Sequence, residues 1–239
     1  MNVIKRDGTA EPLNLDKIHQ MVEFACEDIT GVSSSQVEMN SGLQFFDGIE
    51  SEQIQNILIK SASDLISLDS PNYQFVAARL LLFSVRKQVF ADWNNTGYPK
   101  LKSHVETCAE AGVYDGGILK KYDDEEWEEL NSYIDHQRCY GFTYAGLRQI
   151  VDKYLVQDRS TGRVYETPQY MYIMVAATLF QDYPKDKRLD YVKRYYTATS
   201  KGKINVPTPV LAGVRTPLRQ FASCVLVDVD DTLDSIFTS

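Results

Sequence analysis

A cysteine near the C-terminal end of the chain stands where thiol chemistry is possible. Cys224 follows the string Gly213-Val-Arg-Thr-Pro-Leu-Arg-Gln-Phe-Ala-Ser and precedes a short apolar run, Val225 to Val227. A thiol at the start of a strand can donate hydrogen and take part in thiol–disulfide exchange. A second interpretation is a small buried side chain in a strand, because free cysteines are among the most buried residue types. The strand context alone favours this second interpretation.

Hydroxyl groups lie on the segment that leads to this cysteine. Thr208 lies between Pro207 and Pro209, which stiffen the local backbone. The Thr208 hydroxyl and nearby backbone N–H groups can hold a phosphate group, and the Ser223 hydroxyl can hydrogen-bond to a ligand beside Cys224. We therefore interpret this segment, with Thr208, Ser223 and Cys224, as a candidate part of an active site.

A second candidate site consists of cations near the N-terminus. They come from three predicted elements, namely Lys5, Arg6, Lys17 and Lys87. Such cations can surround a triphosphate, while Glu11 and Asn14 can hydrogen-bond a ribose or a base edge. On spacing alone, solvated surface charges are the more common outcome.

The first predicted region, residues 1–93, is a β-hairpin followed by a four-helix bundle. Asp7-Gly8 supplies the positive φ angles of a tight hairpin turn. The expected helix starts are Asn14 as a cap, a capping box over Ser35–Glu38, Ser51 as a cap, and Ser70-Pro71.

The second predicted region, residues 94–239, begins within a linker over Trp93–Pro99 and is mostly helical to about residue 200. We expect a second hairpin over 154–165 and an apolar helix that Pro168 opens. Another helix follows Pro184, with Leu189, Val192 and Tyr196 facing inward. The acidic stretch 123–129 is interpreted as a solvated helix start.

Composition limits the class of protein. The 239 residues are 44% hydrophobic and carry a net charge of −8, so a packed core is possible, in one large domain or two small ones. A negative charge argues against a nucleic-acid duplex or an anionic membrane as the main partner. No stretch approaches the roughly 18 apolar residues of a membrane span, and no signal run is present. We expect a cytoplasmic protein.

Cysteine and histidine spacing predicts no metal site. The cysteines, Cys26, Cys108, Cys139 and Cys224, form no CxxC pair, and the histidines, His19, His104 and His136, are scattered. We interpret the first three cysteines as structural thiols in a reducing compartment.

Several strings in the first region resemble the ATP-cone, a regulatory nucleotide module of many ribonucleotide reductase large subunits. These strings are Val3-Ile-Lys-Arg-Asp-Gly, Asn14-Leu-Asp-Lys-Ile and Phe75-Val-Ala-Ala-Arg-Leu. The resemblance implies that ATP or dATP contacts Lys5, the stretch Glu11–Lys17, Ser51 and Lys87. Bacterial relatives carry histidines where this chain has Gln55 and Ser84, and a threonine at the position of Ser51. The resemblance therefore leaves inhibition by dATP open.

The resemblance extends to a class I ribonucleoside-diphosphate reductase large subunit through Lys153-Tyr-Leu-Val-Gln, Leu189-Asp-Tyr-Val-Lys-Arg-Tyr and the string around Cys224. It implies that Cys224 is one of two reducing thiols, and that Thr208 and Ser223 bind a ribonucleoside diphosphate. The resulting disulfide is then reduced by thioredoxin or glutaredoxin.

By the same resemblance, Asp231, Thr232 and Leu233 begin the specificity-effector site for a deoxynucleoside triphosphate. Asp231 would accept a bond from the ribose hydroxyl. The second interpretation of this stretch is a polar turn after a strand.

The expected fold class is α+β and mainly helical, with an ATP-cone over 1–93. A helical catalytic part over 94–239 then leads into the first strand of a ten-stranded α/β barrel. We expect the N-terminal fragment of a split large subunit. Its partners would be the C-terminal fragment, with which it forms a large subunit that dimerises, and a radical-bearing small subunit. The alternative is a stand-alone nucleotide-sensing protein without catalysis.

Overall fold

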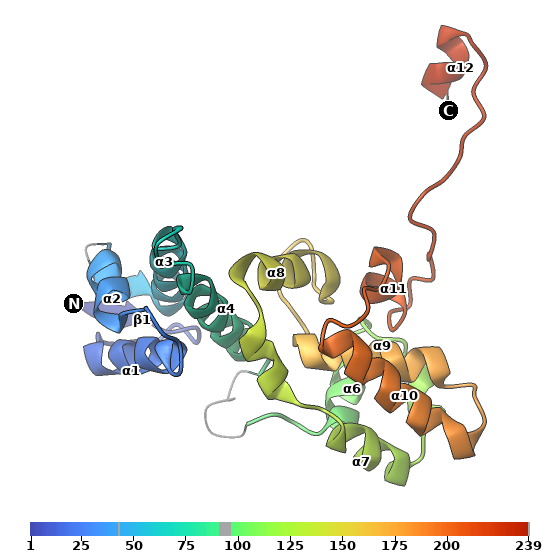
Figure 1. Ribbon diagram of the computed structural model, residues 1–239, viewed down its shortest axis with the longest axis horizontal. Helices are drawn as coiled ribbons and strands as arrows, with labels where there is room; N and C mark the ends of the chain where they lie inside the picture. Colours follow the sequence, from blue (N-terminus) through green and yellow to red (C-terminus); the bar gives the residue numbers. More distant parts are fainter. Residues whose placement is uncertain (43, 91–96, 239) are drawn as a thin grey trace.

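The computed structural model describes residues 1–42, 44–90 and 97–238, and these are mainly helical with one small sheet. In Figure 1 the N-terminal elements gather at one end and a second group of helices at the other. Most of the expected linker Trp93–Pro99, with the predicted boundary at residue 93, lies outside the described residues. No helix within the described ranges is both long and apolar enough to cross a membrane.

The N-terminal hairpin forms, but in its predicted Asp7-Gly8 turn only Gly8 has a positive φ. Strand β1 (Asn2–Ile4) pairs antiparallel with β2 (Ala10–Pro12), with Val3 opposite Glu11. Gly8 has a φ of +82°, which a glycine adopts without steric cost. A third strand, β3 (Ile49–Glu50), adds to β1 in parallel and was not predicted.

Four helices follow the hairpin: α1 (Leu15–Cys26), α2 (Ser34–Gly42), α3 (Ser51–Asp64) and α4 (Tyr73–Val89). The Asn14 cap is confirmed, because its side-chain oxygen accepts from the Lys17 N–H at 3.2 Å.

Three expected helix starts are wrong by one or two residues. Helix α2 already begins at Ser34, so Ser35 is inside it. Glu50 precedes α3 as the N-cap and its N–H donates to Gln53 Oε1 at 3.1 Å, which makes Ser51 the first helical residue. Helix α4 begins at Tyr73, after a turn in which the Gln74 N–H bonds to the Pro71 carbonyl at 3.2 Å.

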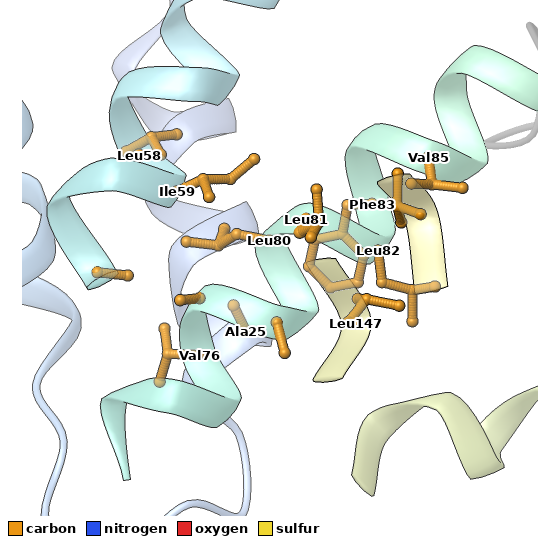
Figure 2. Close-up of a cluster of buried hydrophobic side chains, with 14 of the residues drawn as sticks. Ala25, Leu58, Ile59, Val76, Leu80, Leu81, Leu82, Phe83, Val85 and Leu147 are labelled. Carbon is orange, nitrogen blue, oxygen red and sulfur yellow. The ribbon is translucent and has the colours of Figure 1, made fainter. Parts of the chain in front are cut away.

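Helix α4 forms the centre of the N-terminal core. Figure 2 shows its leucines packed toward α3 on one side and toward Leu147 on another. Leu80, Leu81 and Leu82 are all at most 4% exposed. Burying a leucine side chain contributes about 1.5–3 kcal/mol. The same apolar cluster continues to Ile150, so the core does not stop at residue 93.

The second region holds further helical segments. They are α6 (Leu101–Glu110), η1 (Gly116–Lys120), α7 (Asp124–Ser132), η2 (His136–Gly141), α8 (Tyr144–Gln149), the π-helix η3 (Ile150–Tyr154), α9 (Pro168–Phe180), α10 (Lys185–Ser200), α11 (Thr208–Gly213) and α12 (Leu233–Thr238).

The predictions for α9 and α10 are confirmed, since Pro168 opens α9 and the inner face of α10 buries Val192 and Tyr196 fully. The expected second hairpin is reduced to a single bridge between Gln157 and Val164. The acidic helix start is only partly solvated, because Glu126 is buried and forms an ion pair with Arg188.

The strand expected at Cys224 does not form in this structure. Residues 218–230 have neither helix nor strand, and Figure 1 shows this segment leading away from the helices. Leu226 is fully exposed and Val225 is 79% exposed. A strand is stable only beside neighbours that pair with it, and the described residues offer this segment none.

Candidate functional site

A cavity of about 610 Å³ lies among the hairpin, α1, α3 and α4. Six of the seven residues predicted for the nucleotide site line it, namely Lys5, Glu11, Asn14, Lys17, Ser51 and Lys87. They come from segments far apart in the sequence, so the fold brings together five residues that the spacing suggested and Ser51, which only the resemblance implied.

Arg6 is the predicted residue that does not line the cavity. Its charge still acts on the site. The pKa of Lys87 is lowered, first by burial of the ammonium group and then by the positive charges of Arg6 and Lys5. Arg6 therefore adds to the positive potential around Lys87 without forming the cavity wall.

Glu11 holds two of the lysines in place. Its carboxylate oxygen lies 2.9 Å from the Lys5 ammonium and 3.6 Å from that of Lys17. The hydrogen bond from Lys5 lowers the pKa of Glu11 below its usual value, so this group stays ionised at neutral pH. The cations nevertheless outnumber this carboxylate, and such a surface favours a polyanion.

The local sequence explains these positions. The hairpin places Lys5 directly after β1 and Glu11 within β2. The Asn14 cap starts α1 and places Lys17 in its first turn. Because the cap uses Asn14 Oδ1, a ligand in the cavity would meet the amide nitrogen as a donor.

The cavity also has an apolar wall, which the sequence prediction missed. It includes Met21, Phe24, Ile54 and Phe83, and the rings of Phe24 and Phe83 lie 5.6 Å apart. The apolar face of α1 was the signal that could have located this wall. A wall of this kind beside cations fits a ligand that joins a planar ring to a phosphate chain.

Gln55 adds a fixed polar group to the same cavity. It is 4% exposed, and its amide nitrogen donates to the Leu80 carbonyl at 2.9 Å. This bond orients the side chain and leaves the amide oxygen as the acceptor for a ligand.

The predicted substrate residues are not assembled in the same way. Cys224 is exposed, and the Ser223 hydroxyl lies 3.8 Å from its sulfur. Thr208 is the first residue of α11 and faces the phenol of Tyr154. Within the described residues, no hydrogen bond links Thr208 to Ser223 or Cys224.

The segment predicted for the specificity effector makes local contacts. The Thr232 N–H donates to the Asp230 carbonyl at 2.8 Å, and the Thr232 hydroxyl accepts from the Ser235 N–H at 3.2 Å. Leu233, the first residue of α12, is 73% exposed. In this structure the segment is a turn that starts a short helix.

The other cysteines lie in different surroundings from Cys224. Burial raises the pKa of Cys26 and Cys139 to about 11 and that of Cys108 to about 12. Thiols of this kind stay protonated and are poor nucleophiles. Within the described ranges, no cluster of three or more His, Cys, Asp or Glu side chains is arranged to hold a metal ion.

Comparison with known proteins identifies two families along the chain. Residues 1–88 match the ATP cone domain, and residues 140–219 match the ribonucleotide reductase all-alpha domain. The first match contains the whole cavity, and the second contains Thr208.

Individual relatives match almost the whole chain. The chain is 51% identical over 234 residues to the ribonucleoside-diphosphate reductase subunit alpha of Haemophilus influenzae. These residues cover 98% of the chain and 31% of that relative. The Escherichia coli subunit 1 alpha is 50% identical, with 98% and 30% covered. The subunit alpha of enterobacteria phage T4 is 41% identical, with 99% and 31% covered. The chain thus spans about 30% of the length of these relatives.

Proposed function

From the premise that the chain belongs to the family of ribonucleoside-diphosphate reductase alpha subunits, whose N-terminal part it matches, we propose a double role. It binds ATP or dATP as a regulatory effector, and it contributes one reducing thiol and part of the substrate site to a ribonucleoside-diphosphate reductase. The remaining two thirds of the subunit would come from a complementary polypeptide.

The cavity carries the regulatory part of the proposal. Lysines from three segments and an apolar wall meet within the residues that match the ATP cone domain. The cations suit a triphosphate, while Glu11, Asn14 and Ser51 offer hydrogen bonds to the nucleoside.

The reductive part assigns a redox role to Cys224. The substrate is a ribonucleoside diphosphate, and its 2′-hydroxyl leaves as water. Two thiols, Cys224 and a second cysteine from the complementary polypeptide, provide two electrons and two hydrogens and become a disulfide. Thioredoxin or glutaredoxin then reduces that disulfide by thiol exchange, and a radical-bearing small subunit starts the reaction.

Two further contacts belong to this proposal. Thr208 and Ser223 bind the substrate, and Asp231, Thr232 and Leu233 begin a site for a deoxynucleoside triphosphate that sets substrate preference. The complete large subunit would work as a dimer.

Calorimetric titration of the full chain with ATP tests the regulatory role. Lys5→Met should weaken ATP binding about ten-fold or more, because a hydrogen bond to a charged phosphate is worth about 1.5–3 kcal/mol. Lys60→Met is the matched control, since Lys60 is an exposed lysine of α3 outside the cavity. Absence of ATP binding by the unaltered chain would refute the regulatory role.

Reconstitution tests the reductive role. The chain, the complementary polypeptide and the small subunit are combined, and CDP reduction is measured with a dithiol reductant. Cys224→Ser should abolish turnover, whereas Cys26→Ser should retain it. Unchanged turnover with Cys224→Ser would sink the redox assignment.

One observation favours a second candidate, a nucleotide sensor without catalysis. All residues that line the cavity lie between Val3 and Lys87, so ATP binding needs no side chain beyond them. ATP binding by a chain that never supports CDP reduction in the reconstituted assembly would select this candidate.

A further inference from the structure

Tyr154 is the residue of interest beside Thr208. It ends the π-helix η3, is partly buried, and its phenol oxygen accepts a hydrogen bond from Gln149 Nε2 at 3.1 Å. The Thr208 side chain faces the same oxygen. Together Thr208 and then Gln149 hold the pKa of Tyr154 below its usual range. Sequence reasoning placed no functional residue at this position.

A buried ion pair contacts the backbone of the two elements that carry these hydroxyls. Arg215 and Glu166 are fully buried, and Arg215 Nε lies 2.8 Å from Glu166 Oε2. The carboxylate also accepts from the Tyr114 hydroxyl and from the Val156 N–H, the latter at 2.6 Å. Both charges are therefore compensated, as a buried pair requires.

The guanidinium of Arg215 also reaches the two elements that carry the hydroxyls. One terminal nitrogen donates to the Tyr154 carbonyl at 2.9 Å, and the other donates to the Leu211 carbonyl within α11. Tyr154 ends η3 and Thr208 begins α11. The planar guanidinium of Arg215 therefore hydrogen-bonds to both η3 and α11 and fixes their relative position.

The free proton of the phenol defines what this arrangement can bind. A phenol oxygen accepts hydrogen bonds and also carries one donor proton. Gln149 Nε2 donates to that oxygen at 3.1 Å, and among the hydrogen bonds of the described residues none has the Tyr154 hydroxyl as its donor. The O–H group can therefore donate to an anionic oxygen next to Thr208.

We propose that Tyr154 is a further substrate-binding residue, whose phenol donates a hydrogen bond to the diphosphate of a ribonucleoside diphosphate beside Thr208. The buried Arg215–Glu166 pair is the positioning element that keeps the two hydroxyls together. The identity of the ligand rests on the proposed function, whereas recognition of a phosphate oxygen by this hydroxyl pair does not.

Steady-state kinetics of the reconstituted assembly tests the binding role. Tyr154→Phe removes only the hydroxyl and should raise the KM for CDP about ten-fold with kcat nearly unchanged, because one hydrogen bond to a charged group is lost. Tyr183→Phe, which alters an exposed tyrosine after α9, should change neither constant. An unchanged KM for Tyr154→Phe, or a loss confined to kcat, would overturn the proposal.

A double-mutant cycle tests the positioning role. Arg215→Lys keeps a charge for Glu166 but cannot donate to both carbonyls at once, so it should also raise the KM. Because both changes disturb one contact, Tyr154→Phe combined with Arg215→Lys should raise the KM little beyond the larger single effect. Fully multiplicative effects would show that Arg215 acts on stability alone.

A direct binding measurement separates this inference from the proposed function. The full chain is labelled with ¹³C at the ring carbon that bears the tyrosine hydroxyl and titrated with inorganic pyrophosphate. The Tyr154 signal, identified by its loss in Tyr154→Phe, should shift, and Thr208→Val should abolish that shift. An assembly that reduces CDP but whose chain shows no shift refutes the inference alone. A shift without CDP reduction by the unaltered assembly refutes the proposed function alone.

Discussion

The N-terminal cavity and the segment around Cys224 differ in how much of their surroundings the chain itself supplies. The cavity is lined by the β1–β2 hairpin and by the helices α1, α3 and α4, which share a buried core. The Cys224 segment has neither helix nor strand, and Leu226 on it is fully exposed. A site formed between packed helices is complete once they fold, whereas a site on a strand waits for the neighbouring strands.

The largest expected effect on stability concerns the buried Arg215–Glu166 ion pair, which lies where the chain leaves the helices toward the Cys224 segment. Glu166→Ala leaves the buried Arg215 charge without its partner and should lower the free energy of unfolding by about 3–5 kcal/mol. Urea denaturation of the full chain measures this loss.

The control for Glu166→Ala is an exposed ion pair. The side chains of Arg194 and Asp190 are 72% and 67% exposed. Arg194→Ala breaks their contact and should lower the free energy of unfolding by less than about 1 kcal/mol. Similar losses of unfolding free energy for both variants would show that the buried Arg215–Glu166 pair stabilises the fold no more than an exposed pair does.

The same chemical change in each region compares them directly. Leu80→Ala opens a cavity in the core of α4 and should cost about 2–5 kcal/mol. Leu226→Ala should change stability by at most about 0.5 kcal/mol, because its side chain touches little in this structure. Thermal or urea unfolding measures both changes in stability. A large loss for Leu226→Ala would mean that the Cys224 segment packs on the helices.

ATP binding should weaken as the pH rises, through Lys87. Burial and the charges of Arg6 and Lys5 lower its pKa in the free chain, and a bound triphosphate would raise it again. Affinity should therefore be greatest below the lowered pKa and fall by up to about ten-fold per pH unit above it. Calorimetric titrations from neutral to alkaline pH measure this slope.

Lys87→Arg is the matched control, because a guanidinium keeps its charge throughout this range. Its affinity should fall less with pH than that of the unaltered chain. Equal slopes for the two proteins would remove Lys87 from the phosphate contacts.

The smallest expected effect concerns His19 on α1. A hydrogen bond with Glu38, then the charges of Glu23 and Glu38, raise its pKa above the usual 6.5. A raised folded-state pKa stabilises the fold fully below the unfolded-state pKa, and this contribution is lost as pH rises through the folded-state value. Urea unfolding across this window should show a small decline in stability that His19→Gln flattens.

Local signals in the sequence predicted most of the helices. Asn14 caps α1 and Pro168 opens α9 because each acts on the turn that follows it. Strand β3 was missed because Ile49–Glu50 is too short to show an alternating pattern. The sequence indicates Ser51 as the cap because serine is a common N-cap residue, yet Glu50 occupies that position.

The two candidate sites were predictable to different degrees. Six of the seven residues predicted for the nucleotide site line the cavity, although the predicted starts of α3 and α4, which carry Ser51 and Lys87, are one and two residues away from the observed ones. The Arg215 cluster was not predictable, because its partners Glu166 and Tyr154 lie 49 and 61 positions away. Only tertiary packing brings such residues together, and no local pattern marks them.

Helix α4 belongs to two interfaces at once, and this limits how the part of the chain up to α4 can be grafted onto another protein. Phe83 and Lys87 line the cavity, while Arg86 donates to the Tyr140 hydroxyl of η2 at 2.8 Å and the neighbouring leucines join the cluster of Leu147. A graft cut after α4 would carry the cavity but leave the other face of that helix without its native neighbour. A folded chimaera would therefore also need the residues of η2 and α8 that contact α4.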